Sequence, residues 1–196
     1  MTPNLLAVCC GSSVANADIY AAHLTAAMDR FEINTPSRQA ALLATIAIES
    51  ERLRKVEEGL YYTTADRLRE VYPSLFGPRG QHRAEDYLRS IQGLSNLRYN
   101  GFHGRGLIQL TWLDAYSAAG SDLGYDYVHD PGLVKQPLHA ALTACWFFAQ
   151  YRKCLAPADA GDMYTVTGLV NGPARLQLAE RKAQYLVALK ALQAAG

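Results

Sequence analysis

This chain lacks both a strong charge imbalance and a long hydrophobic run. Its 19 lysines and arginines face 18 aspartates and glutamates, for a net charge of +1. That balance excludes a global electrostatic attraction to nucleic acid. No apolar run approaches the roughly 20 residues that a transmembrane helix needs, so stable membrane association is not expected. Hydrophobic residues make up 49% and charged residues 19% of the 196 residues, which is typical of a folded globular protein.

Cysteines and histidines are too few and too scattered to suggest a metal centre. The five histidines show no ligand spacing, and neither do the four cysteines. Cys9 and Cys10 are adjacent, and Cys145 and Cys154 fall in an apolar, helical stretch, so we expect buried free thiols. We therefore expect no metal and no cofactor, and synthesis in a reducing cytosol.

The apolar run at residues 5–10 is similar to the core of a secretory signal. It is only six residues long, and no basic segment precedes it. The apolar pattern continues through residues 19–28. We therefore interpret this region as part of the mature fold.

Helix signals dominate the rest of the chain, which predicts a mainly α fold class. Thr35 followed by Pro36 is a strong helix start, because the first residue can cap the helix and the second needs no amide hydrogen there. Residues 100–106 form a glycine-rich loop that leads into a short strand or extended segment at 107–112. The predicted helices lie at about residues 12–31, 36–49, 63–72, 83–91, 138–151, 163–170 and 175–194.

The most polar part of the chain lies between Thr63 and Asn100. It carries six arginines against four acidic residues, for a local balance of +2. We expect residues 63–102 to form a small inserted helical lobe. Residues 1–62 and 103–196 would then form the larger, catalytic lobe. The arginines of the small lobe either attract an anionic polymer or are simply solvated.

Glu49 ends the most apolar helical segment. Residues 40–48 are apolar on nearly every face, which indicates a buried helix. An ionised carboxylate is costly to bury without a partner, and a carboxyl group whose charged form is disfavoured can act as a general acid. The alternative is that Glu49 is only the first polar residue after a core helix. A second carboxylate, Glu58, follows nine residues later.

Two carboxyl groups near a polar wall suit the cleavage of a glycosidic bond. One carboxylic acid protonates the leaving oxygen, and the other carboxylate attacks the sugar or activates a water molecule. The block Gly-Arg-Gly-Leu-Ile-Gln-Leu-Thr at residues 104–111 supplies Gln109 and Thr111. Their side chains can hold that water or a sugar hydroxyl.

Together these motifs resemble glycoside hydrolase family 19, in particular the bacteriophage endolysins related to the plant chitinases of that family. Residues 49–50 match the motif of the catalytic acid, and residues 56–62 match the segment of the second glutamate. Residues 104–111 are the most specific block. Residues 171–172 with Arg181 resemble the closing asparagine-glycine motif.

The resemblance implies a lysozyme-like helical fold with two lobes flanking a cleft, and an inverting mechanism. It implies that Glu49 is the acid and Glu58 the base. It also implies that Thr111 and Gln109 position the water and the sugar.

Three positions leave alternatives open. Glu57 is the rival for the role of base, and its other interpretation is a solvated partner of Arg54 or Lys55. Ile48 stands where the family usually has histidine, and Gly59 stands where asparagine is common. Both departures leave the two glutamates intact and concern substrate length and sugar contacts.

Four further residues are candidates for substrate binding. Tyr61 and Tyr62 can stack on sugar faces, although aromatic residues at such positions often serve packing instead. Asn171 can bond the substrate or simply terminate a helix. Arg181 is included for its place in the closing motif.

The resemblance implies an endolysin that hydrolyses β-1,4 bonds of peptidoglycan as a muramidase. We expect a monomer that binds peptidoglycan glycan strands and binds no nucleic acid. It would accumulate in the host bacterial cytoplasm and act on the cell wall in the periplasm. The alternatives are a chitinase, which would more often carry a secretion signal, and a non-catalytic glycan-binding protein, which would be expected to lose a glutamate. A lytic transglycosylase would need only one carboxyl group.

Overall fold

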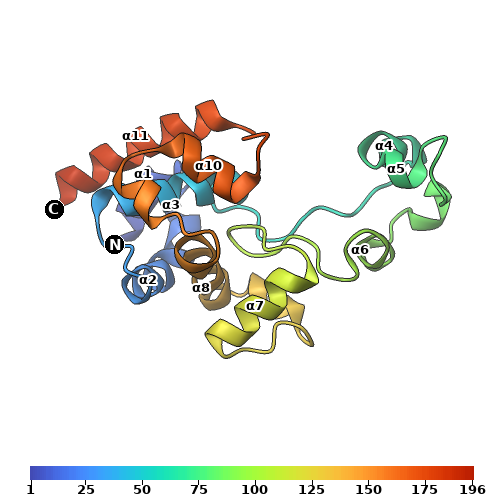
Figure 1. Cartoon of the computed structure of the whole chain (residues 1–196), viewed down its shortest axis with the longest axis horizontal. Coiled ribbons are helices and arrows are strands. Elements are labelled where there is room, and N and C mark those ends of the chain that lie inside the picture. The colour runs from blue at the N-terminus through green and yellow to red at the C-terminus, as the bar shows by residue number, and fades with distance from the viewer.

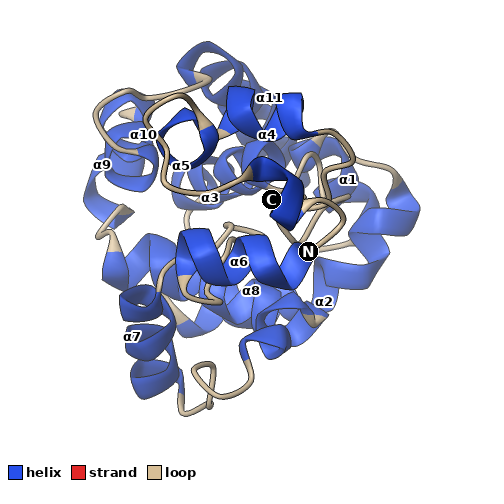
Figure 2. Ribbon diagram, turned by 90° about the vertical axis from the view of Figure 1, so that its right-hand side faces the viewer, coloured by secondary structure: helices blue, strands red, loops and turns tan.

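The computed structural model describes residues 1–196 and contains only helices, turns and loops, as Figure 2 shows. The mainly α fold class is therefore confirmed. In chain order, the elements are α1 (Pro3–Cys10), α2 (Val14–Arg30), α3 (Pro36–Glu49), α4 (Ala65–Val71), α5 (Pro73–Phe76), the 3₁₀ helix η1 (Ala84–Tyr87), α6 (Ile91–Tyr99), α7 (Leu113–Leu123), the 3₁₀ helix η2 (Pro131–Lys135), α8 (Pro137–Trp146), the π-helical segment η3 (Phe147–Tyr151), α9 (Leu155–Asp159), α10 (Met163–Asn171) and α11 (Leu178–Ala195).

The main core is built around α3. Most of its 44 buried residues come from α1, α2, α3, α7, α8, α10, α11 and the loop before α7, and the rest come from η2, η3, α9 and the other loops. Helix α11 packs along α3 and α1, and α2 packs against α8. In Figure 1 these helices form the larger body of the molecule. Residues 40–47 are all buried, as the apolar sequence there predicts.

A second, smaller core lies apart from the first. Helices α4, α5 and α6 stand away from the main body in Figure 1, joined to it by extended connections. This small core starts three residues before the lobe boundary predicted at residue 63. Its six buried residues are Leu60, Leu68, Phe76, Ala84, Leu94 and Tyr99.

Capping residues position the helices that carry the site. The Thr35 hydroxyl accepts a hydrogen bond from the Arg38 amide at 3.2 Å, and Pro36 is the first residue of α3. The Asp162 carboxylate accepts hydrogen bonds from the amides of Tyr164 and Thr165 at the start of α10. Each cap satisfies amides that the first turn of a helix leaves free. Both predicted helix starts are confirmed.

Two predicted elements were wrong in their details. A helix was expected over residues 83–91, but η1 covers only Ala84–Tyr87. Arg89 has a φ of +56°, which ends any helix there, and Ser90 caps the separate helix α6. The final helix starts at Leu178, because Arg175 and Gln177 have φ values of +46° and +57°.

The other two departures lie beside the site. Residues 107–112 form turns held by an isolated pairing of Arg105 with Leu110, and not a strand. The helix predicted over residues 138–151 is α8 followed by η3, whose turns are wider. A π-helical turn within a helix often marks a functional site.

All four cysteines are free and buried, as predicted. Burial raises the pKa of the Cys9 thiol to about 11.

No single helix is long and apolar enough to cross a membrane. Helices α1 and α2 pass that test of length and composition only as a pair, and they are bent by 107° at Gly11.

Candidate active site

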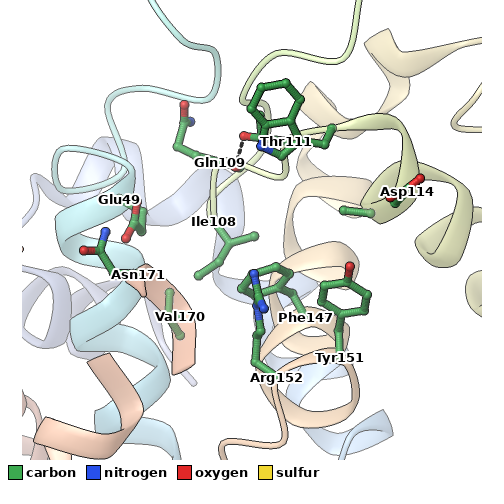
Figure 3. A pocket seen from close by; sticks show the side chains of 12 residues that line it. Glu49, Ile108, Gln109, Thr111, Asp114, Phe147, Tyr151, Arg152, Val170 and Asn171 are labelled. Atoms are coloured by element: carbon green, nitrogen blue, oxygen red, sulfur yellow. Dashed lines mark hydrogen bonds between the residues drawn. The ribbon is translucent and has the colours of Figure 1, made fainter. Parts of the chain in front are cut away.

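A pocket of about 570 Å³ lies at the end of α3. The loop before α7 and the start of α7 form one wall, and η3 with the end of α10 forms another (Figure 3). Four residues predicted from the sequence meet here: Glu49, Gln109, Thr111 and Asn171. The remaining lining residues are Ile108, Trp112, Asp114, Ala115, Phe147, Tyr151, Arg152 and Val170.

Glu49 forms an ion pair with Arg181. The Arg181 Nη2 atom lies 2.5 Å from Glu49 Oε1, and the Glu49 side chain is 18% exposed. Arg181 itself is 1% exposed, and its Nη1 atom has no hydrogen-bond partner within the protein. The predicted role of Arg181 in binding substrate needs correction, because this guanidinium is buried behind the glutamate. Its contact orients Glu49.

The loop before α7 presents Gln109 and Thr111 in a fixed turn. Gln109 has a φ of +53°, and its Nε2 donates to the Gly106 carbonyl at 3.1 Å. The Thr111 hydroxyl donates to the Gln109 carbonyl at 2.8 Å, as drawn in Figure 3. Because this hydroxyl uses its only hydrogen in the turn, its lone pairs remain free to accept a hydrogen bond from water or sugar.

Gly104 connects this wall to Glu58. A Cβ atom at Gly104 would lie 2.9 Å from Gln109 Oε1 and 3.4 Å from Thr111 Oγ1, so glycine lets both side chains pack against this backbone. The Gly104 amide donates to Glu58 Oε2 at 3.3 Å, and the Tyr99 hydroxyl donates to Oε1 at 2.6 Å. Glu58 is half-buried and does not line the pocket itself.

Glu57 accepts hydrogen bonds from one histidine and from two cationic side chains. Its Oε1 accepts hydrogen bonds from His103 at 3.1 Å and Arg105 at 3.3 Å, and its Oε2 accepts one from Lys135 at 3.0 Å. Burial raises the pKa of Glu57, but the hydrogen bonds from Lys135 and His103 outweigh that effect and hold the pKa below its usual value. The alternative interpretation of Glu57 as a solvated partner of Arg54 or Lys55 was wrong.

His103 stands at the centre of this network and is neutral in it. Arg105 Nη2 lies 3.1 Å from His103 Nδ1. Since a guanidinium can only donate, Nδ1 accepts and Nε2 carries the hydrogen that points to Glu57. Burial, followed by the charge of Arg105, lowers the pKa of His103. Ser95 of α6 lies 2.6 Å from the same Nδ1, so the network reaches into the small core.

The predicted tyrosines lie outside the pocket. Tyr61 is 58% exposed. Tyr62 packs edge-on against Tyr72, with ring centroids 6.0 Å apart, beside the small core. Asn171 lines the pocket as the last residue of α10, and its Oδ1 accepts a hydrogen bond from the Leu176 amide at 2.9 Å. The helix-terminating interpretation of Asn171 is confirmed by this bond. The residue also lines the pocket, where binding of substrate stays a prediction.

The wall formed by η3 was not predicted from the sequence. Phe147 and Tyr151 lie in the helix predicted over residues 138–151, and Arg152 follows them. The Arg152 guanidinium lies over both rings, 5.0 Å and 5.2 Å from their centroids. Asp114 at the start of α7 was missed as well. The only signal was the cluster of aromatic residues before an arginine, and it does not reveal which turn of the helix opens to solvent.

Glu49 and Glu58 are the two carboxyl groups available for acid–base chemistry at this site. Glu49 enters the pocket at the end of α3, and Glu58 is fixed by the Gly104 amide and the Tyr99 hydroxyl. Burial, together with the hydrogen bond to Glu58, raises the pKa of Tyr99, so this hydroxyl stays protonated and continues to donate. These two hydrogen bonds orient the half-buried Glu58.

Comparison with known proteins agrees with this architecture. The sequence model of the family described as Chitinase class I matches residues 68–185, more than half of the chain. A segment of 49 residues is 39% identical to chitinase 6 of Oryza sativa subsp. japonica, which covers 24% of this chain. The aligned segment spans only 18% of the rice protein.

Solved structures share the fold at low sequence identity. A bacterial family 19 chitinase superposes with a TM-score of 0.58 at 24% identity, covering 89% of this chain and 87% of that one. Chitinase C from Streptomyces griseus HUT6037 gives 0.57 at 22% identity, over 87% of this chain and 68% of its own. A class IV chitinase from Zea mays gives 0.54 at 19%, over 87% and 78%.

The family match begins after both Glu49 and Glu58, so it identifies the fold and the later motifs and not the two glutamates. It includes the Gly-Arg-Gly block, the end of α10 and Arg181. The first two of these segments line the pocket that Glu49 enters, and Arg181 lies behind Glu49. The chain therefore belongs to glycoside hydrolase family 19 and is a glycoside hydrolase.

Proposed function

We propose that this protein hydrolyses the β-1,4 bonds of bacterial peptidoglycan as a phage-type endolysin, with Glu49 as general acid and Glu58 as general base. The observation that carries the proposal is that Glu49, Gln109 and Thr111 line one pocket. Glu58 is bonded to the Gly104 amide, in the loop that also carries Gln109 and Thr111. An inverting glycosidase requires its acid and base to stand roughly 6.5–9.5 Å apart, so that a water molecule fits between the base and the sugar.

Glu49 is the acid because it alone of the two glutamates lines the pocket. Arg181 fixes its orientation. Glu58 is preferred over Glu57 as the base because the cations Arg105 and Lys135 each bond one oxygen of Glu57.

The water molecule lies between Glu58 and the sugar in this proposal. Thr111 accepts a hydrogen bond from it, because the single hydroxyl hydrogen of Thr111 is already donated to Gln109. The Gln109 side chain and Asn171 contact the sugar. Exposed Tyr61 provides a further stacking surface beyond the pocket.

The substrate class rests on the similarity of the motifs around Glu49, Glu58 and residues 104–111 to those of phage endolysins. Chitin is the second candidate, because the relatives and solved structures named above are chitinases. Both polymers share β-1,4-linked N-acetylated sugars. They differ in the lactyl-peptide substituent that alternate sugars of peptidoglycan carry.

Digestion of purified peptidoglycan and of chitin oligomers, followed by mass spectrometry, tests the proposal. We expect peptidoglycan to be cleaved faster, with new reducing N-acetylmuramic acid ends. Reducing N-acetylglucosamine ends would change the bond assignment, and anhydro ends would indicate a transglycosylase. Cleavage of chitin oligomers alone would replace the proposal with the chitinase alternative.

A further inference from the structure

Arg152 is an exposed cation on the wall of the pocket. It directly follows η3, and its amide donates to the Phe147 carbonyl at 2.8 Å, which closes the π-helical segment. Its guanidinium lies over the rings of Phe147 and Tyr151, whose centroids are 5.5 Å apart. The two rings therefore hold the arginine in place beside the pocket, and Figure 3 shows it pointing into the opening.

Arg152 has no acidic partner. Five other arginines form ion pairs with carboxylates, namely Arg38, Arg67, Arg69, Arg105 and Arg181. The two acidic residues of the pocket do not pair with Arg152: Glu49 bonds Arg181, and Asp114 has no cation within 4.0 Å. The pocket thus presents one positive charge with free N–H groups.

Stacking leaves the edge of a guanidinium free. Its N–H groups lie in the plane of the group, so a guanidinium that lies over a ring can still donate two parallel hydrogen bonds to a carboxylate. Chitin carries no charge. In peptidoglycan, every second sugar carries a 3-O-lactyl substituent that ends in a carboxylate or continues into an acidic peptide.

We propose that Arg152 binds a carboxylate of this lactyl-peptide substituent and thereby selects peptidoglycan over chitin. This inference rests on the proposed function and assigns a specificity-determining residue to it. The uncharged sugars are held by Gln109, Thr111 and Asn171, so Arg152 contributes much less on an uncharged substrate than on a carboxylate. Asp114, in the same pocket, repels the carboxylate and limits its binding.

The test compares Arg152→Gln with wild type on three substrates: peptidoglycan fragments with peptide stems, strands freed of stems by an amidase, and chitin oligomers. A hydrogen bond to a charged group is worth enough that its loss should raise KM about tenfold or more on carboxylate-bearing substrates. KM on chitin oligomers should rise much less, by about threefold at most, the range of one neutral hydrogen bond. Arg152→Lys should restore part of the binding, and Asp114→Asn should lower KM on the charged substrates only.

Arg30→Gln is the matched control. Arg30 is also an exposed arginine over an aromatic ring, 5.3 Å from the Phe31 centroid, but it lies on α2 outside the pocket. This variant should behave as wild type on all three substrates. Melting temperatures of all variants identify any loss of fold.

The outcomes separate the two claims. An effect on stem-bearing fragments alone assigns the carboxylate to the peptide, and an effect on stem-free strands assigns it to the lactyl group. If wild type cleaves peptidoglycan and Arg152→Gln does so equally well, or if the variant loses chitin binding to the same extent, the inference fails and the proposed function stands. If wild type cleaves neither peptidoglycan substrate, both fail.

Discussion

Glu49 is the residue on which the proposed chemistry depends most. Glu49→Gln keeps the size of the side chain and its contact with Arg181 but removes the proton that is donated. General acid catalysis contributes roughly 10²–10⁴-fold, so the rate of glycan cleavage should fall at least about a hundredfold with little change in melting temperature. Glu51→Gln, two residues further along, is the control, because Glu51 is exposed and pairs only with Lys55. A folded Glu49→Gln variant with near wild-type turnover would contradict the role.

Thr111 distinguishes a water-binding hydroxyl from a purely structural one. Thr111→Val keeps the branched shape but loses both the hydrogen bond to Gln109 and the acceptor for water. We expect kcat to fall about three- to tenfold, the range of one neutral hydrogen bond. Thr111→Ser keeps the hydroxyl and should retain most of the activity. Steady-state kinetics with a melting curve checks this, and full activity of Thr111→Val would remove Thr111 from the site.

Single residues also show what could be predicted from the sequence. Glu49, Gln109, Thr111 and Asn171 could be found because each belongs to a short local motif, and all four meet in the pocket. The Glu49–Arg181 contact joins positions 132 apart in the chain, and only the packing of α11 on α3 creates it. No local pattern could therefore show that Arg181 is buried.

At the scale of elements, a helix start marked by a capping residue could be predicted from the sequence. Helix ends caused by a positive φ at a residue other than glycine could not. The start of α3 followed from Thr35 with Pro36, because side-chain caps are local signals. The break at Arg89 and the late start of α11 depend on residues other than glycine with positive φ. Such residues are sterically unfavourable and carry no clear mark in the sequence.

The network of Glu57 and His103 joins the loop before α7 to α6, and it should make stability depend on pH. The folded state lowers the pKa of His103, so below about pH 6.5 the unfolded chain binds more protons at this position. Stability should therefore fall as the pH drops from 7 towards 5. The lowered pKa of Glu57 adds a further loss only at lower pH, as that carboxylate is protonated.

His103→Gln tests this assignment. Glutamine can still donate to Glu57 but does not titrate, so the difference in unfolding midpoint between pH 7 and pH 5 should be smaller than in wild type. Urea unfolding at the two pH values measures it. The exposed His129, which pairs only with Asp126, supplies the control His129→Gln. Equal pH dependence in wild type and His103→Gln would show that other groups govern stability in this range.

At the scale of the whole molecule, the elements around the small core carry exposed arginines on their surface. Arg67 and Arg69 pair with acidic residues, whereas Arg79, Arg83 and Arg89 have no acidic partner. If these three attract an anionic wall, replacing them together by glutamine should raise the apparent KM on intact wall roughly threefold or more at low salt. The effect should vanish at high salt, because exposed charges are screened.

A second triple variant controls for net charge. Arg30, Lys182 and Lys190 lie on α2 and α11 in the main body, and replacing them by glutamine removes the same total charge. Wall binding at low salt should change less in this variant. Equal effects of the two triple variants would mean that overall charge matters and the position of the arginines does not.

The stereochemistry of cleavage tests the central claim most directly. If Glu49 is the acid and Glu58 activates a water molecule, each β-linked bond is opened with inversion. Proton NMR of a soluble glycan substrate should then show the α-anomer of the new reducing end first, before mutarotation. First appearance of the β-anomer would contradict the account, because retention requires two successive displacements through an intermediate, formed with a carboxylate or with the acetamido group of the sugar, and not direct attack by water.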